Sequence, residues 1–157
     1  MYINKEQKEK IQNKIKEVES KSSAEILAVI SNSAKGYFLP KFIVNILPKK
    51  YKQNIANKYI NNYFYNIQKQ HKDVKNIVLF FVCLDEQYVK IITSKNISNK
   101  ITNSYWQDII NNFIVDIKRS NLDEGFLKAM NSCKDILIEK FPNINDENKI
   151  KNDIVQL

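Results

Sequence analysis

The longest unbroken apolar run of the chain covers residues 77–84 and is rich in branched and aromatic side chains. Such a run favours a strand buried on both faces over an amphipathic helix. Asp85 and Glu86 end the run, and a second β-favouring run, residues 88–92, is interrupted only by Lys90. We therefore predict a strand, a tight acidic turn and a second strand, which form an antiparallel hairpin at the centre of a sheet.

Residues 24–31 predict a further strand, because apolar side chains fill both alternating sets of positions after Glu25. Glu25 is the one charge in this strand. A carboxylate at the start of a strand can serve as a metal ligand or a base, but most carboxylates in proteins are solvated. We therefore expect Glu25 to reach solvent at the end of the sheet.

Apolar residues at spacings of three and four indicate amphipathic helices that cover both faces of the sheet. The first, residues 5–20, has a narrow stripe, and a longer helix opens at Pro48, which suits a first turn because it lacks an N–H. A third has the clearest 3.6-residue period, and Ser104 with Gln107 predicts a capping box at its start. A last helix ends at residues 141–142, Phe-Pro.

The length of 157 residues fits one domain, which we place at residues 1–142. A hydrophobic fraction of 43% with only 2 Gly and 3 Pro is typical of a globular chain. Residues 93–104 are polar and predict an irregular loop. Residues 143–157 are polar with sparse apolar positions, and we expect a docked or partly ordered tail.

The two cysteines, Cys83 and Cys133, lie within apolar patterns, so we expect buried free thiols rather than a disulfide. The single His and the absence of cysteine pairs at ligand spacing argue against a zinc site. The polar N-terminal segment lacks the apolar core of a signal peptide, which predicts a cytoplasmic location.

The net charge of +8 favours anionic partners, either nucleic acid or a membrane surface, although a solvated lysine-rich surface is the simpler reading. Lysines and four tyrosines in residues 49–65 resemble a surface on which bases stack. Their helical spacing would bury these aromatics in one stripe, and we therefore favour packing over nucleic-acid binding.

An apolar patch, residues 37–47, is shorter than the roughly 20 residues of a transmembrane helix. Lysines follow it directly, as the positive-inside tendency would place them on the cytoplasmic side of a membrane segment. The residues predicted to contact a membrane or a partner are Phe38, Phe42, Ile43, Lys49, Lys50 and Lys52.

Several segments together resemble a known family. AEILAVISNSAKGY looks like its first strand, and residues 82–110 look like its turn, strand, polar loop and a helix entered through Trp106. Residues 121–142 match its terminal helix, with a Gly-Phe start and a Phe-Pro end, and residues 147–154 match a tail motif of Asn and apolar residues. On these segments the chain resembles the TPM domain family, in particular its bacterial membrane-protein branch.

The resemblance implies an α/β fold, a three-layer α/β/α sandwich with a mixed sheet of about four strands. Some relatives are associated with acid phosphatase activity and some bind calcium, so the resemblance allows Ca²⁺ as a cofactor. An Asp expected after the first strand corresponds to Ala34, and the Asp and Gly of the polar loop correspond to Ser94 and Asn96. These losses weaken the case for metal chemistry, because hard cations need several oxygen ligands.

The bacterial branch looks as if it carries a transmembrane hairpin between the first strand and the long helix. This chain has only the patch of residues 37–47 at that place. We therefore expect the patch to lie at the inner face of the cytoplasmic membrane.

In the absence of a catalytic motif, we favour a non-enzymatic scaffold or partner-binding module at the cytoplasmic membrane face. Its partner would be an anionic membrane surface or a membrane protein. The enzymatic alternative is a metal-dependent acid phosphatase that uses Glu25, Asp85 and Glu86, and weak nucleic-acid binding is a third hypothesis. An exposed edge on the sheet would favour pairing with another strand.

Overall fold

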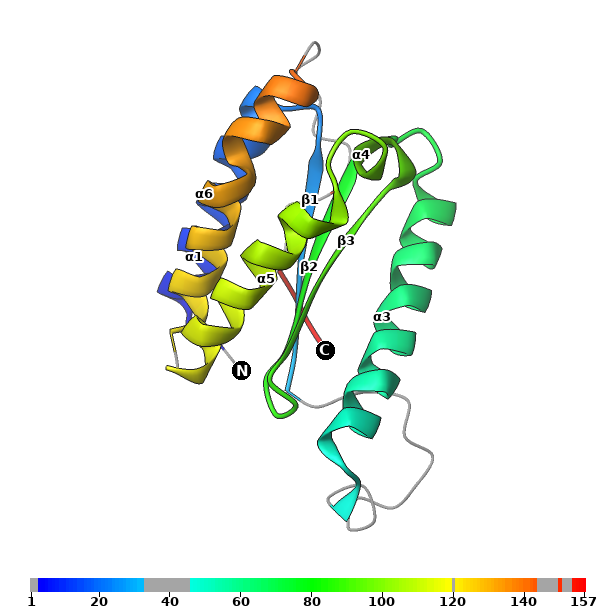
Figure 1. Cartoon of the computed structure of the whole chain (residues 1–157). Helices are drawn as coiled ribbons and strands as arrows, with labels where there is room; N and C mark the ends of the chain where they lie inside the picture. The colour runs from blue at the N-terminus through cyan, green and yellow to red at the C-terminus, as the bar shows by residue number, and fades with distance from the viewer. Residues whose placement is uncertain (1–2, 33–45, 120, 144–149, 151–153) are drawn as a thin grey trace.

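A computed structural model describes residues 3–32, 46–119, 121–143, 150 and 154–157. Helices and strands alternate in the first part of the chain, and helices dominate the second (Figure 1). The elements are α1 (Lys5–Lys21), β1 (Glu25–Ser31), α3 (Lys49–Gln70), β2 (Ile77–Cys83), β3 (Tyr88–Thr93), α4 (Lys95–Ser98), α5 (Asn103–Lys118), α6 (Leu122–Lys140) and β4 (Ile154–Gln156).

The sheet has four strands in the order β3-β2-β1-β4. β1 pairs in parallel with both β2 and β4, and β3 pairs antiparallel with β2. The predicted hairpin is confirmed, but its predicted position at the centre of the sheet is wrong. β1 and β2 are central because α3 carries the chain across the sheet to a parallel neighbour, which leaves β3 as an edge strand.

The two central strands are buried along their whole length, as their continuous apolar runs predict. One set of alternating side chains, which includes Ile26, Ala28, Val78 and Phe80, packs with α1, α5 and α6. The other set faces α3. Figure 1 shows the sheet between these two layers of helices, and the predicted three-layer α/β/α architecture is confirmed.

The predicted helices are present, with changes at their ends. α1 begins with a capping box that was not predicted, in which Asn4 and Gln7 exchange hydrogen bonds of 2.9 Å. α3 begins directly after Pro48, as predicted. The capping box predicted at Ser104 is wrong, because α5 already begins at Asn103 and no side chain caps it.

Two polar segments contain more regular structure than their composition indicates. The predicted irregular loop after the hairpin contains the short helix α4, which buries Ile97 between polar neighbours. At the C-terminal end, Ile154–Gln156 pairs with β1 as β4, a strand that was not predicted. Short elements of this kind are stabilised by the tertiary structure around them rather than by their own periodicity.

The helices α5 and α6 approach each other closely at Gly125. A Cβ built there would lie 2.5 Å from Phe113 Cε2, so no larger residue fits without displacement of the ring. The same ring packs edge-to-face against Phe126 with a centroid distance of 4.9 Å. The two predicted free thiols, Cys83 and Cys133, are confirmed as buried and unpaired.

Candidate functional site

The three candidate catalytic carboxylates do not converge. Glu25 pairs in register with Ile77 at the start of β2, whereas Asp85 and Glu86 follow its last residue, Cys83. At about 3.3 Å per residue, the length of β2 puts about 20 Å between the two groups. The structure therefore brings Asp85 and Glu86 together in one turn and leaves Glu25 at the opposite end of the sheet.

Glu25 does not reach solvent, contrary to our expectation. Glu25 is only 6% exposed to solvent. The backbone N–H of Ile150 donates to its Oε2 at 3.2 Å. Glu25 therefore holds the C-terminal part of the chain against the start of β1, which is a structural role.

Glu86 is also held inside the protein. It is 3% exposed, and the Cys83 thiol donates to its Oε2 at 2.7 Å. Burial and this hydrogen bond raise the pKa of the Cys83 thiol, so the thiol stays protonated as the donor. Gln53 of α3 donates to the Glu86 backbone oxygen at 3.0 Å, and this contact ties the turn to the helix. Only Asp85 of the turn is solvent-exposed.

The described residues do not offer a built calcium site. Within this part of the chain, no group of three His, Cys, Asp or Glu side chains lies close enough to hold a metal ion. A calcium ion needs six to eight oxygen ligands, of which carboxylates supply most of the charge. The separation of Glu25 from the acidic turn is the geometric reason for the poor fit.

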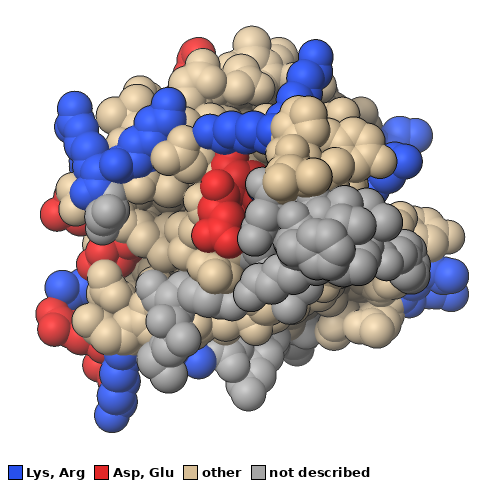
Figure 2. All heavy atoms as spheres, turned by 90° about the horizontal axis from the view of Figure 1, so that it is seen from below, with Lys and Arg blue, Asp and Glu red and all other residues tan. Residues whose placement is uncertain are grey.

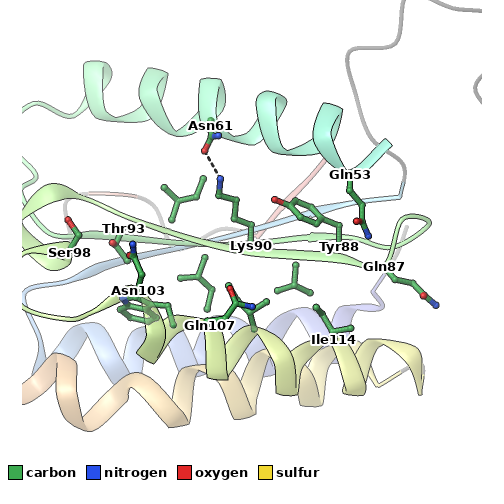
Figure 3. Close-up of a pocket in the computed structure, with 15 residues that line it drawn as sticks. Gln53, Asn61, Gln87, Tyr88, Lys90, Thr93, Ser98, Asn103, Gln107 and Ile114 are labelled. Atoms are coloured by element: carbon green, nitrogen blue, oxygen red, sulfur yellow. Dashed lines mark hydrogen bonds between the residues drawn. The ribbon is translucent and has the colours of Figure 1, made fainter. Parts of the chain in front are cut away.

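An open groove of about 620 Å³ follows the outer edge of the sheet (Figure 3). We call it the β3 groove, and all of β3 lines it. Gln53 and Asn61 of α3 form one wall, and Trp106, Ile110 and Ile114 of α5 are the main apolar part of the other. None of the described residues that line it is acidic.

The α3 wall of the β3 groove carries a polar cluster around Lys90. The Lys90 ammonium donates to Asn61 Oδ1 at 2.9 Å and also to Asn57 Oδ1, which accepts from the Tyr88 hydroxyl at 3.1 Å. Figure 3 shows Lys90 reaching from β3 to Asn61 on α3. Partial burial lowers the pKa of Lys90. Among the described residues, no carboxylate forms an ion pair with this ammonium.

The α5 wall is mainly apolar and contains one unusual donor. Trp106 is only 4% exposed and lines the β3 groove. Its indole N–H has no hydrogen-bond partner among the described residues. A buried donor without an acceptor costs about 1–3 kcal/mol of stability.

The start of α3 exposes apolar and basic side chains together. Ile46 is 80% exposed and Tyr51 54%, and Lys49 and Lys50 between them are exposed as well. Lys49 donates to Gln87 Oε1 at 2.8 Å, which links this end of α3 to the β2–β3 turn. Figure 2 shows this end of the molecule, with basic side chains around the rim and an acidic group near the middle.

The predicted membrane contacts are only partly within the described residues. Lys49, Lys50 and Lys52 lie in the first turn of α3, and Lys52 is partly buried. Phe38, Phe42 and Ile43 lie outside the described residues. Among the helices that the structure does describe, none has both the length and the apolar character of a bilayer span.

A family model for the TPM domain matches residues 1–136. The chain belongs to the TPM domain family. The resemblance inferred from the four sequence segments is therefore confirmed at the level of the family. A search of the curated proteins finds no match.

The fold of this TPM domain is similar to that of a solved bacterial protein. The NMR structure of BA42 protein from the psychrophilic bacterium Bizionia argentinensis superimposes with a TM-score of 0.73 at 18% identity. The alignment covers 99% of this chain and 96% of that chain. At this identity the similarity supports the α/β fold alone.

The β3 groove of this TPM domain was not predicted from the sequence. Asn57 and Asn61 are one helical turn apart in the polar part of α3, and Lys90 is the single interruption of an apolar strand. Lys90 was the one available signal, because it is the only charge in this otherwise β-favouring apolar run. Its partners come from a helix about thirty residues away in sequence, and only the tertiary structure identifies them.

Proposed function

We propose that this TPM domain is a non-enzymatic module that binds a protein partner at an anionic membrane surface, the inner face of the cytoplasmic membrane. The observation that carries the proposal is the exposed start of α3. Ile46 and Tyr51 supply apolar side chains there, and Lys49 and Lys50 supply positive charge beside them. This combination is typical of segments that rest on a lipid headgroup layer.

Electrostatics and apolar insertion would act together at this surface. Each Lys close to an anionic leaflet contributes about 1 kcal/mol, and the contribution decays within a Debye length. Lys49 and Lys50 would thus supply about 2 kcal/mol at low ionic strength. Ile46 adds apolar area that is already exposed and needs no rearrangement of the core.

Co-sedimentation of the whole chain with vesicles tests the membrane part. We expect binding to vesicles that contain phosphatidylserine and little binding to pure phosphatidylcholine. The double variant Lys49→Glu with Lys50→Glu should lose about tenfold or more in affinity, because attraction becomes repulsion. The matched control is Lys72→Glu with Lys75→Glu, which makes the same charge change at exposed positions just past the other end of α3.

Equal binding by the two double variants would reject the start of α3 as the contact. No binding to anionic vesicles at low salt would reject the membrane part altogether. A charge effect alone, without a contribution from Ile46, predicts that Ile46→Ser leaves binding unchanged. The proposal instead predicts weaker binding for this variant too.

A metal-dependent phosphatase is the less favoured function. Such chemistry needs carboxylates that converge on one metal ion and substrate. The separation of Glu25 from Asp85 and Glu86 argues against it. We expect turnover of a phosphomonoester to stay at background with Ca²⁺, Mg²⁺ or Mn²⁺. Turnover that Glu25→Gln or Asp85→Asn abolishes would reverse this choice.

A further inference from the structure

We propose that the β3 groove binds an extended acidic segment of a partner protein, which adds a strand to the outer edge of β3. This inference rests on the partner-binding part of the proposed function and names the partner's chemistry. Three observations carry it: the free edge of β3, the two unlike walls and the ammonium of Lys90. Each limits what the occupant can be.

The backbone of β3 offers an alternating set of free groups. Ser94 N–H donates to Ile77 O at 2.9 Å, which places this pair among the hydrogen-bonded pairs of the antiparallel ladder. The alternation of such pairs makes Tyr88, Lys90 and Ile92 bond inward to β2. The N–H and C=O groups of Val89, Ile91 and Thr93 therefore point to the outer edge, where no described strand pairs with them.

An extended backbone is the ligand that matches these groups. It supplies an acceptor and a donor at every second residue, with the same spacing as β3. Its side chains would alternate between the two walls of the β3 groove. One set would lie against Ile110 and Ile114 of α5, and the other set against Asn61 of α3 and the Lys90 side chain of β3.

Charge determines which side chains suit the α3 wall. Lys90 is partly buried, donates only to neutral amide oxygens, and no acidic side chain among the described residues lines the β3 groove. An ammonium in this environment gains from a carboxylate more than an exposed lysine does, because nearby solvent screens it less. We therefore assign acidic residues to the α3 side of the added strand and apolar residues to the α5 side.

A second copy of the chain is a poorer occupant. If two β3 strands paired edge to edge, two Lys90 ammonium groups would share one groove. Like charges on facing strands are destabilising. The net charge of +8 adds repulsion between two copies and attraction to an acidic partner.

Titration of the ¹⁵N-labelled whole chain with the peptide acetyl-VEVEVEV-amide tests the proposal. We expect saturable binding and new protection from hydrogen exchange at the amides of Val89, Ile91 and Thr93. The amides of Tyr88, Lys90 and Ile92 should change little, because they already bond to β2. The matched peptide with glutamine in place of glutamate should bind about tenfold more weakly.

Two variants locate the charge effect. Lys90→Gln should bind the glutamate peptide about tenfold more weakly and the glutamine peptide within about twofold of the wild type. Lys58→Gln is the matched control, since Lys58 is an exposed lysine of α3 outside the β3 groove, and it should bind as the wild type does. If Lys90→Gln does not fold, the preference of the wild type for glutamate over glutamine still decides the question.

The inference would be overturned by a lack of saturation up to about 1 mM peptide, by protection that does not alternate along β3, or by equal affinity for the two peptides. Concentration-dependent shifts of the β3 amides without peptide would assign the edge to a second copy and overturn it as well. If the peptide does not bind but the protein still binds anionic vesicles, only the acidic-segment inference is rejected and the proposed function stands. Peptide binding without vesicle binding rejects only the membrane part of the proposed function.

Discussion

The two faces of the sheet are covered differently. Three helices, α1, α5 and α6, pack on one face, while α3 is the helix on the other among the described residues (Figure 1). A helix is about 10 Å wide with its side chains, whereas four strands about 4.8 Å apart span about 14 Å between the outer strand axes. A single helix therefore covers only part of its face, and α3 lies over the side formed by β2 and β3.

We assign the two faces of the sheet different roles, one in stability and the other in binding. The three-helix face buries most of the aromatic and aliphatic core, including the Phe113–Phe126 pair. The α3 face carries the features that we assign to binding, namely the exposed start of α3 and the polar wall of the β3 groove. We therefore expect substitutions on the first face to change folding, and those around α3 to change the binding that we propose.

The largest effect on stability is expected when a buried phenylalanine is truncated on each face of the sheet. Phe126→Ala should lower the free energy of unfolding by about 3–5 kcal/mol, and Phe64→Ala on α3 by about 1 kcal/mol less. Both rings are buried, but Phe126 also gives up its edge-to-face contact with Phe113. Urea unfolding followed by circular dichroism measures both. A cost for Phe64→Ala that equals or exceeds that of Phe126→Ala would contradict the ranking of the faces.

A smaller effect is expected at the contact between α5 and α6. Gly125→Ala should lower the free energy of unfolding by about 1–3 kcal/mol, because the alanine Cβ would overlap the buried Phe113 ring. Thermal unfolding of this variant is compared with that of Asn112→Ala, an exposed position of α5 that should change stability by about 0.5 kcal/mol or less. An unchanged or raised stability for Gly125→Ala would show that the two helices can separate without cost.

The smallest effect concerns an ion-pair network between α1 and α6. A hydrogen bond from Lys14 and a weaker contribution from Lys134 lower the pKa of Glu17 from 4.5 to about 2. A carboxyl group whose pKa is lower in the folded than in the unfolded protein stabilises the folded state at pH values above the unfolded pKa. This stabilisation is lost as the pH falls from 4.5 towards 2. The stability difference between wild type and Glu17→Gln should therefore shrink across this window.

Unfolding at a series of pH values measures this difference. Glu139→Gln is the control, because among the described residues its carboxylate pairs only with the neighbouring Lys140 on the same helix. A difference for Glu17→Gln that stays constant from pH 7 to pH 2 would contradict the assigned pKa.

The sequence predicted the elements with clear periodicity and missed those without it. The all-apolar runs of β1 and β2 and the helical stripes of α1, α3, α5 and α6 came directly from spacing. α4 and β4 are too short to show a period, and they form because Ile97 and Ile154 are buried by distant parts of the chain. The burial of Glu25 escaped prediction for the same reason, since its partner Ile150 is 125 positions away.

The candidate site was the least predictable part. Carboxylates can be found in a sequence, but which end of a sheet they occupy depends on strand direction and register. The parallel pairing of β1 with β2 separated Glu25 from Asp85 and Glu86. The groove residues Lys90 and Asn61 gave little signal, because neither residue type indicates a particular chemistry alone.

The sequence by itself determined which segments are buried on two sides, which helices are amphipathic, and the family to which the chain is similar. These properties follow from local spacing, since the periods of 2.0 and 3.6 residues are set by the backbone. Only the tertiary structure decided that β3 lies at an edge, that Lys90 meets two asparagines of α3, and that the acidic turn is far from Glu25. Those outcomes depend on pairing between segments far apart in the chain, which local periodicity does not encode.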